Sequence, residues 1–117
     1  MSVTLKGFLI LLFALNHILN REEIEKSEVE IDVSNIKTNK ELHLLLKKKL
    51  KFPHIYEENW EDFWETITGR IELPNKIKFV GWKVLESRLP VDTKILQDYI
   101  LEHNLEFPDW ECECLFN

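Results

Sequence analysis

The sequence predicts an α/β domain with a small three-stranded parallel sheet and helices packed mainly on one of its faces. Short strand-like stretches alternate with longer stretches in which apolar residues recur at helical spacing. The connections between successive strands are long enough to hold helices, and such connections join parallel strands through right-handed crossovers. At 117 residues the chain suits one compact domain.

One strand and two helices are expected in the first half of this domain. Residues 28–33 alternate acidic and apolar side chains, which is the pattern of a half-exposed strand. Thr38 is placed to cap a first helix, whose leucines share one face and which ends at the Phe-Pro pair at 52–53. Asn59 is placed to cap a second helix, and Gly69 fits a left-handed C-terminal cap.

The second helix sorts its side chains onto two faces. The apolar face is formed by Trp60, Phe63, Trp64 and Ile67. The polar face is formed by Glu58, Glu61, Asp62, Glu65 and Thr68. An ordinary solvated face with acids in its first turn explains Glu61 and Asp62, because such acids complement the helix dipole. It explains Glu65 less well, since like charges four residues apart repel, and the alternative is a surface that meets a basic partner.

The second half is expected to contain a strand, a helix and a terminal strand. Residues 77–82 form the strand and run into a loop, and the last helix starts at Asp92 or Thr93. The apolar stripe of that helix is formed by Ile95, Leu96, Tyr99, Ile100 and Leu101. Residues 110–116 alternate cleanly and predict the terminal strand.

Cys112 and Cys114 are the two cysteines of the chain. Because they are two positions apart on a strand, they point the same way, and a disulfide between them would be strained. Two ligands are also fewer than a zinc site needs. We interpret both as small buried side chains on one strand face, and free thiols favour the reducing cytoplasm as the location.

An apolar extension, residues 1–27, is expected to precede the domain, which spans residues 28–117. Residues 7–15 are the most apolar run of the chain and follow a lysine, as in the hydrophobic part of a signal peptide. The run is too short to span a bilayer, and no small-residue cleavage site follows it. We therefore favour an added helix or strand packed on the domain over a signal-like segment.

Charge is distributed unevenly along the chain. With 15 basic and 21 acidic residues the net charge is −6, which disfavours binding of nucleic acid through bulk charge. Residues 37–51 hold six lysines and one glutamate, whereas residues 54–72 hold six acids and one arginine. These segments carry net charges of +5 and −5, so the total conceals a strongly acidic helix and loop beside a basic helix.

Three motifs in the acidic and basic segments occur in a specific combination. The first helix carries L-H-x-x-L-K-K from residue 42, the loop carries P-x-x-Y-x-E-N from residue 53, and the second helix carries W-x-x-x-T-G from residue 64. Together they resemble the barstar family of bacterial ribonuclease inhibitors. The clear similarity covers residues 29–82, and the last helix and strand agree in order and length more than in residues.

The resemblance implies an inhibitor that plugs a ribonuclease active site with the second helix and the loop before it. The implied partner-binding residues are Ile55, Glu57, Asn59, Trp60, Glu61, Trp64, Glu65, Thr68 and Gly69. Acidic side chains there stand in for RNA phosphates, with Glu65 as the anchor and Glu61 second. The implied partner is a basic secreted or delivered ribonuclease toxin, bound one to one by a monomer, with no direct binding of nucleic acid or membrane. No cofactor, metal or catalytic residue is expected.

Several residues depart from the family pattern. Ile55 stands where an inhibitory tyrosine is expected, Glu57 where a glycine is expected, and Arg70 where an aromatic residue is expected. Both key acids are glutamates rather than aspartates, and the place of an acidic contact from the last helix falls near Leu101. These departures leave open a barstar-like immunity or regulatory protein whose partner is another toxin class or an unrelated protein.

An enzyme is the third hypothesis. Glu61 and Glu65 are paired carboxylates that could do acid–base work, and His54 lies near Glu58 in the sequence. No nucleophile–base pair or glycine-rich cofactor loop accompanies them, so we do not expect an enzyme.

Overall fold

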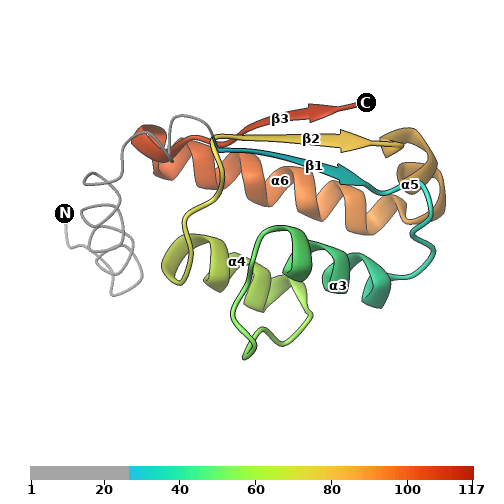
Figure 1. Ribbon diagram of the computed structural model, residues 1–117, viewed down its shortest axis with the longest axis horizontal. Coiled ribbons are helices and arrows are strands. Elements are labelled where there is room, and N and C mark those ends of the chain that lie inside the picture. The colour runs from blue at the N-terminus through green and yellow to red at the C-terminus, as the bar shows by residue number, and fades with distance from the viewer. Residues whose placement is uncertain (1–26) are drawn as a thin grey trace.

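The computed structural model describes residues 27–117 (Figure 1). The apolar run at residues 7–15, and with it the choice between an added element and a signal-like segment, lies outside the described residues. The elements follow in the order β1 (Glu28–Asp32), α3 (Asn39–Lys49), α4 (Trp60–Gly69), β2 (Lys76–Val80), α5 (Trp82–Arg88), α6 (Pro90–Glu106), the 3₁₀ helix η1 (Pro108–Trp110) and β3 (Glu113–Phe116). In the part of the chain that is described, no helix has both the length and the apolar character to cross a bilayer.

The three strands form one parallel sheet in the order β1-β2-β3. Figure 1 shows α3, α4 and α6 on one side of this sheet, while α5 lies at the carboxyl end of β2. The predicted fold class, a three-stranded parallel sheet with helices mainly on one face, is therefore confirmed.

Alternation along the strands separates a core face of the sheet from a polar face. Ile31 is paired with Phe79 in the register of β1 and β2, and both are fully buried against the helices. On the other face Glu28 lies beside Lys76 and Glu30 beside Lys78, and opposite charges on neighbouring strands stabilise a sheet. The core is completed by side chains from the helices, among them Leu42, Leu46, Phe63, Ile67, Leu85 and Leu96.

The prediction of a strand over residues 77–82 running into a loop is wrong at its end. Strand β2 stops at Val80, and Gly81 turns the chain with a φ of 79°. A side chain at Gly81 would place a Cβ 2.6 Å from the Cβ of Ser34, so both the conformation and the space require glycine. The turn leads into helix α5, in which Trp82 and Leu85 are buried.

Helix α6 begins earlier than the predicted start at Asp92 or Thr93. Pro90 occupies the first turn, where its missing N–H leaves no hydrogen bond unmade. Thr93 is buried and donates its hydroxyl to the carbonyl of Leu89, so it is part of the helix rather than its cap. The predicted apolar stripe is wrong at Leu101, which is 59% exposed, whereas His103 is buried.

The terminal strand is shorter than the predicted range of 110–116. Residues 108–110 form η1, in which the N–H of Trp110 donates to the carbonyl of Phe107, and β3 begins only at Glu113. Cys112 therefore lies just before the strand and is buried, while Cys114 lies in the strand and is half-buried. The two side chains point to the same side, as predicted.

Candidate binding surface on helix α4 and its preceding loop

The loop of residues 51–59 joins α3 to α4. The N–H of Phe52 donates to the carbonyl of Lys47, and the N–H of Tyr56 donates to that of Pro53 at 3.0 Å. Tyr56 is buried, and its neighbour Ile55 is 67% exposed. The loop thus buries the side chain of Tyr56 in the core and exposes that of Ile55 to solvent.

The start of α4 is joined to this loop by two side chains. Asn59 caps the helix as predicted, because its Oδ1 accepts from the N–H of Asp62 at 2.7 Å. The second side chain is that of Asp62, whose Oδ2 accepts a hydrogen bond from the N–H of Glu57 in the loop at 2.7 Å. Between them Glu58 has a φ of 59°, a left-handed conformation that this pair of bonds holds in place.

The prediction that Asp62 lies on the exposed polar face of α4 is wrong. Asp62 is only 6% exposed, and its Oδ1 accepts a hydrogen bond from Arg70 Nη1 at 2.8 Å. Arg70 also lies 3.7 Å from Glu65 and donates to Thr66 Oγ1 at 3.2 Å. Arg70, which stands where the family pattern has an aromatic residue, is therefore paired with acids of α4.

The predicted left-handed cap at Gly69 is also wrong. Gly69 belongs to α4, and the cap is Arg70 with a φ of −114°. The N–H groups of Arg70 and Ile71 both donate to the carbonyl of Thr66, so the last turn ends without a left-handed residue. Gly81 is the only glycine of residues 27–117 with a positive φ.

Trp60 is held by a hydrogen bond and by a ring contact. Its indole N–H donates to Asp92 Oδ1 at 2.8 Å, and Asn39 Nδ2 donates to the same oxygen at 2.7 Å. The Trp60 ring also lies 4.3 Å, centroid to centroid, from the ring of buried His43. Asp92 thus links α3, α4 and α6. From its sequence Asp92 is expected only as the start of a helix, and an acid in a first turn gives no signal of such a link.

A buried hydrogen bond supports the loop from below. His43 Nδ1 pairs with the hydroxyl of Tyr56, and that hydroxyl also donates to the carbonyl of Asn59. Burial lowers the pKa of His43 and raises that of Tyr56, so the ring is neutral and the hydroxyl protonated at neutral pH. Nearby Asp92 and Glu58 partly oppose the lowering of the His43 pKa, while Asp62 and Glu58 add to the rise of the Tyr56 pKa.

The nine predicted site residues differ in exposure. Ile55, Glu57, Asn59 and Glu61 are exposed, Trp60, Trp64 and Glu65 are half-buried, and Thr68 and Gly69 are buried. Thr68 donates its hydroxyl to the carbonyl of Trp64, and Trp64 packs on Tyr99 of α6. Leu101, near the place of an expected acid, instead lines a pocket between α6 and β3.

The two key acids lie one helical turn apart on α4. Glu61 is exposed and has neither a hydrogen bond nor an ion pair to any of residues 27–117, whereas the Glu65 side chain is 37% exposed and lies near Arg70. No group of three metal-binding side chains forms within residues 27–117. The chemistry that this surface offers is therefore carboxylate recognition of a cationic partner on a scaffold that the bonds of Asp62 and Asn59 keep rigid.

Comparison with known families gives one match. A family model described as "Barstar (barnase inhibitor)" matches residues 27–113. The match covers nearly every residue that the structure describes, including the loop, α4 and the start of β3.

Proposed function

We propose an inhibitory function for this chain, on the premise that it belongs to the barstar family. The family match confirms the resemblance that the motifs between residues 42 and 69 indicate. The members of this family are inhibitors, not enzymes, so the family implies a ribonuclease as partner and a protein–protein interaction as the mode of action.

The specific proposal is that α4 and the loop before it block the active site of a cognate bacterial ribonuclease toxin. Ribonuclease sites gather cationic side chains around a phosphate, and a carboxylate on a rigid support can take the place of that phosphate. The observation that carries the proposal is the pair of acids one turn apart on α4, of which Glu61 is exposed and Glu65 is half-buried, together with the exposure of Ile55 in the preceding loop.

The partly buried position of Glu65 favours it as the anchor. Its side chain needs to lose less hydration and less rotamer freedom on binding than that of fully exposed Glu61. Glu57 and Glu61 add negative potential at the rim, which increases the rate of association with a basic protein. We therefore expect Glu65→Gln to act on dissociation and Glu61→Gln mainly on association.

The experiment measures binding to, and inhibition of, a basic secreted ribonuclease encoded beside the gene of this chain. Glu65→Gln is expected to raise Kd by roughly 30- to 150-fold, equivalent to about 2–3 kcal/mol. Glu86→Gln, an exposed acid on α5, is the matched control and should leave Kd unchanged. An unchanged Kd in Glu65→Gln, with the complex intact, contradicts the assignment of the anchor.

The proposal also states the stoichiometry of the complex and the compartment in which it forms. A monomer would bind one ribonuclease molecule in the cytoplasm of the producing cell, before the toxin leaves it. Light scattering of the mixed proteins should give the mass of a one-to-one complex, and a mass that contains two inhibitor chains contradicts this stoichiometry.

A second candidate function uses the same surface to bind a partner that is not a ribonuclease. The 67% exposure of Ile55 favours it, because a nuclease site that recognises phosphates offers little apolar surface to such a side chain. A stable complex in which the partner still cleaves RNA, or cleaves none by itself, would select this candidate.

A further inference from the structure

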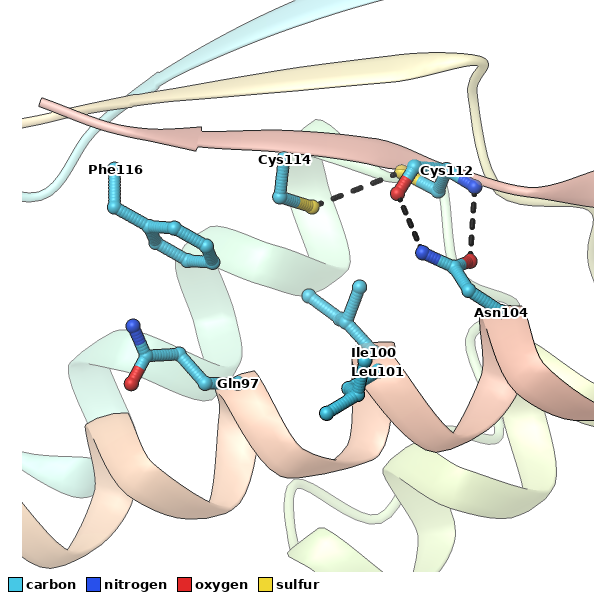
Figure 2. Close-up of a pocket in the computed structure, with 7 residues that line it drawn as sticks. All are labelled: Gln97, Ile100, Leu101, Asn104, Cys112, Cys114 and Phe116. Carbon is cyan, nitrogen blue, oxygen red and sulfur yellow. Dashed lines mark hydrogen bonds between the residues drawn. The ribbon is translucent and has the colours of Figure 1, made fainter.

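The structure brings the two cysteines of the chain together at the start of β3 (Figure 2). The distance between Cys112 Sγ and Cys114 Sγ is 3.9 Å. Cys112 is buried and Cys114 is half-buried, so the pair has one protected and one accessible sulfur. Neither thiol belongs to the loop and helix proposed to bind a ribonuclease.

Both thiols line a pocket between α6 and β3 with a volume of about 290 Å³. Figure 2 shows Cys114 and Phe116 pointing from β3 towards α6, whose Ile100 and Leu101 form the opposite wall. Apart from Gln97 and Asn104 the lining has no amide or charged side chain, and a largely apolar site favours a ligand that needs no coordinated water. The pocket therefore suits a soft, weakly hydrated ligand that the sulfurs can reach directly.

Asn104 holds Cys112 in position. Its Oδ1 accepts from the N–H of Cys112 at 2.9 Å, and its Nδ2 donates to the carbonyl of the same residue at 2.8 Å. With its backbone fixed from α6, Cys112 has little freedom, and any adjustment of the distance between the sulfurs falls to Cys114. Fixed ligands of this kind are characteristic of binding sites that precede their ligand.

Binding of a metal ion by the pair requires both thiols to lose their protons. A strongly thiophilic metal ion displaces these protons, because metal–thiolate bonds form at the expense of S–H bonds.

The number of ligands selects the kind of metal. Within residues 27–117 no third histidine, cysteine, aspartate or glutamate joins this pair, whereas structural zinc takes four such ligands. Copper in its monovalent state prefers sulfur and accepts two thiolates as a complete ligand set. Linear coordination would place the sulfurs slightly farther apart than 3.9 Å, whereas a disulfide would require them to close to about 2.05 Å.

We propose that Cys112 and Cys114 bind one soft monovalent metal ion, Cu(I), between their sulfurs. In this step two S–H bonds break, two S–Cu bonds form, both protons pass to solvent and copper remains monovalent. The site is separate from the acidic surface of α4, so its occupation does not depend on the proposed inhibition of a ribonuclease.

The experiment titrates the full chain with Cu(I) in the absence of oxygen, against a colorimetric Cu(I) chelator. We expect one ion per chain, and a loss of affinity of at least tenfold in Cys114→Ser, a conservative change at a half-buried position. The matched control combines Cys114→Ser with Ser87→Cys, which places a thiol at an exposed position of α5. This double variant has two thiols, as the original chain has, but they do not form a pair. Far-ultraviolet circular dichroism checks that each variant is folded.

Four results would overturn the proposal. The first is an unchanged affinity in Cys114→Ser, and the second is full recovery of affinity in the control with the displaced thiol. The third is a complex in which two chains share one ion, because the pair would then not form an intrachain site. Tighter binding of Zn(II) than of Cu(I) would also contradict the assignment of the metal.

Discussion

Helix α4 carries acids on two sides, and the two sides differ in what surrounds them. On the inner side, Asp62 is buried and accepts hydrogen bonds from Arg70 and from the N–H of Glu57. On the outer side, Glu61 is exposed and unpaired within residues 27–117. Neighbours in the sequence with the same charge therefore have different roles. Asp62 maintains the shape of the surface, and Glu61 is available to a partner.

Removal of the inner acid is expected to have the largest effect. Asp62→Ala would leave the Arg70 guanidinium and the N–H of Glu57 without their carboxylate, and we expect a loss of about 3 kcal/mol in the free energy of unfolding. Urea denaturation measures this loss. Glu61→Ala is the paired variant on the outer side and should change the free energy by less than about 0.5 kcal/mol. Equal effects of the two substitutions would remove the distinction between the sides.

Acidification tests the two buried histidines, His43 beneath the loop and His103 on α6. Burial lowers the pKa of both, so the unfolded chain binds more protons than the folded chain below about pH 6.5. Stability should therefore fall as the pH decreases from about 7 to 5.5, by up to about 1 kcal/mol for each histidine. Urea denaturation across this range measures the loss, and an NMR titration follows each imidazole. A His43 pKa above the ordinary histidine value of about 6.5 would contradict the prediction.

A smaller loss is expected when the hydroxyl beneath the loop is removed. Tyr56→Phe keeps the ring in the core but takes away the hydrogen bond to His43 Nδ1. Because His43 Nε2 has no partner among residues 27–117, the imidazole would then have none there at all. We expect a loss of about 1 kcal/mol in urea denaturation. Tyr99→Phe, on α6, is a control with the same chemical change, and a loss equal to that of Tyr56→Phe would argue against the buried bond.

The smallest effect is expected at an exposed ion pair. Lys94 and Asp98 lie 3.1 Å apart on α6, but both side chains are mostly exposed. Lys94→Ala should change the free energy of unfolding by no more than about 0.5 kcal/mol, because water screens such a pair. Thermal denaturation of Lys94→Ala and of Asp62→Ala compares the loss of an exposed ion pair directly with the loss of a buried one. A loss as large as that of Asp62→Ala would show that exposure does not separate the two kinds of pair.

Features that depend on nearby residues could be predicted from the sequence. The caps at Thr38 and Asn59, the alternation in β1 and the apolar face of α4 each follow from a pattern of a few positions. Predictions failed where a more distant contact decided the outcome. The strand expected to reach residue 82 stops at Val80, because Gly81 turns the chain with a positive φ in a space that Ser34 leaves too small for a side chain. The stripe expected on α6 loses Leu101, which is exposed and lines a pocket at the sheet edge.

The candidate site divides in the same way. Its location on α4 and the preceding loop follows from motifs and local charge, whereas the state of each side chain does not. Arg70 appeared only as a departure from the family pattern, yet from the C-terminal cap of α4 it pairs with Asp62 eight residues away. Trp60 appeared to be an apolar contact, yet its indole N–H is bonded to Asp92 on another helix.

By itself, the sequence determined the order of the three strands and the three longer helices, the segment that carries the acidic surface and the family to which the chain belongs. These depend on spacing, caps and motifs, which act over a few residues. Only the tertiary structure decided which acids are structural and which are available, and that two thiols share a pocket. Burial and pairing depend on side chains brought together from separate elements, such as Asn39 and Trp60 at Asp92.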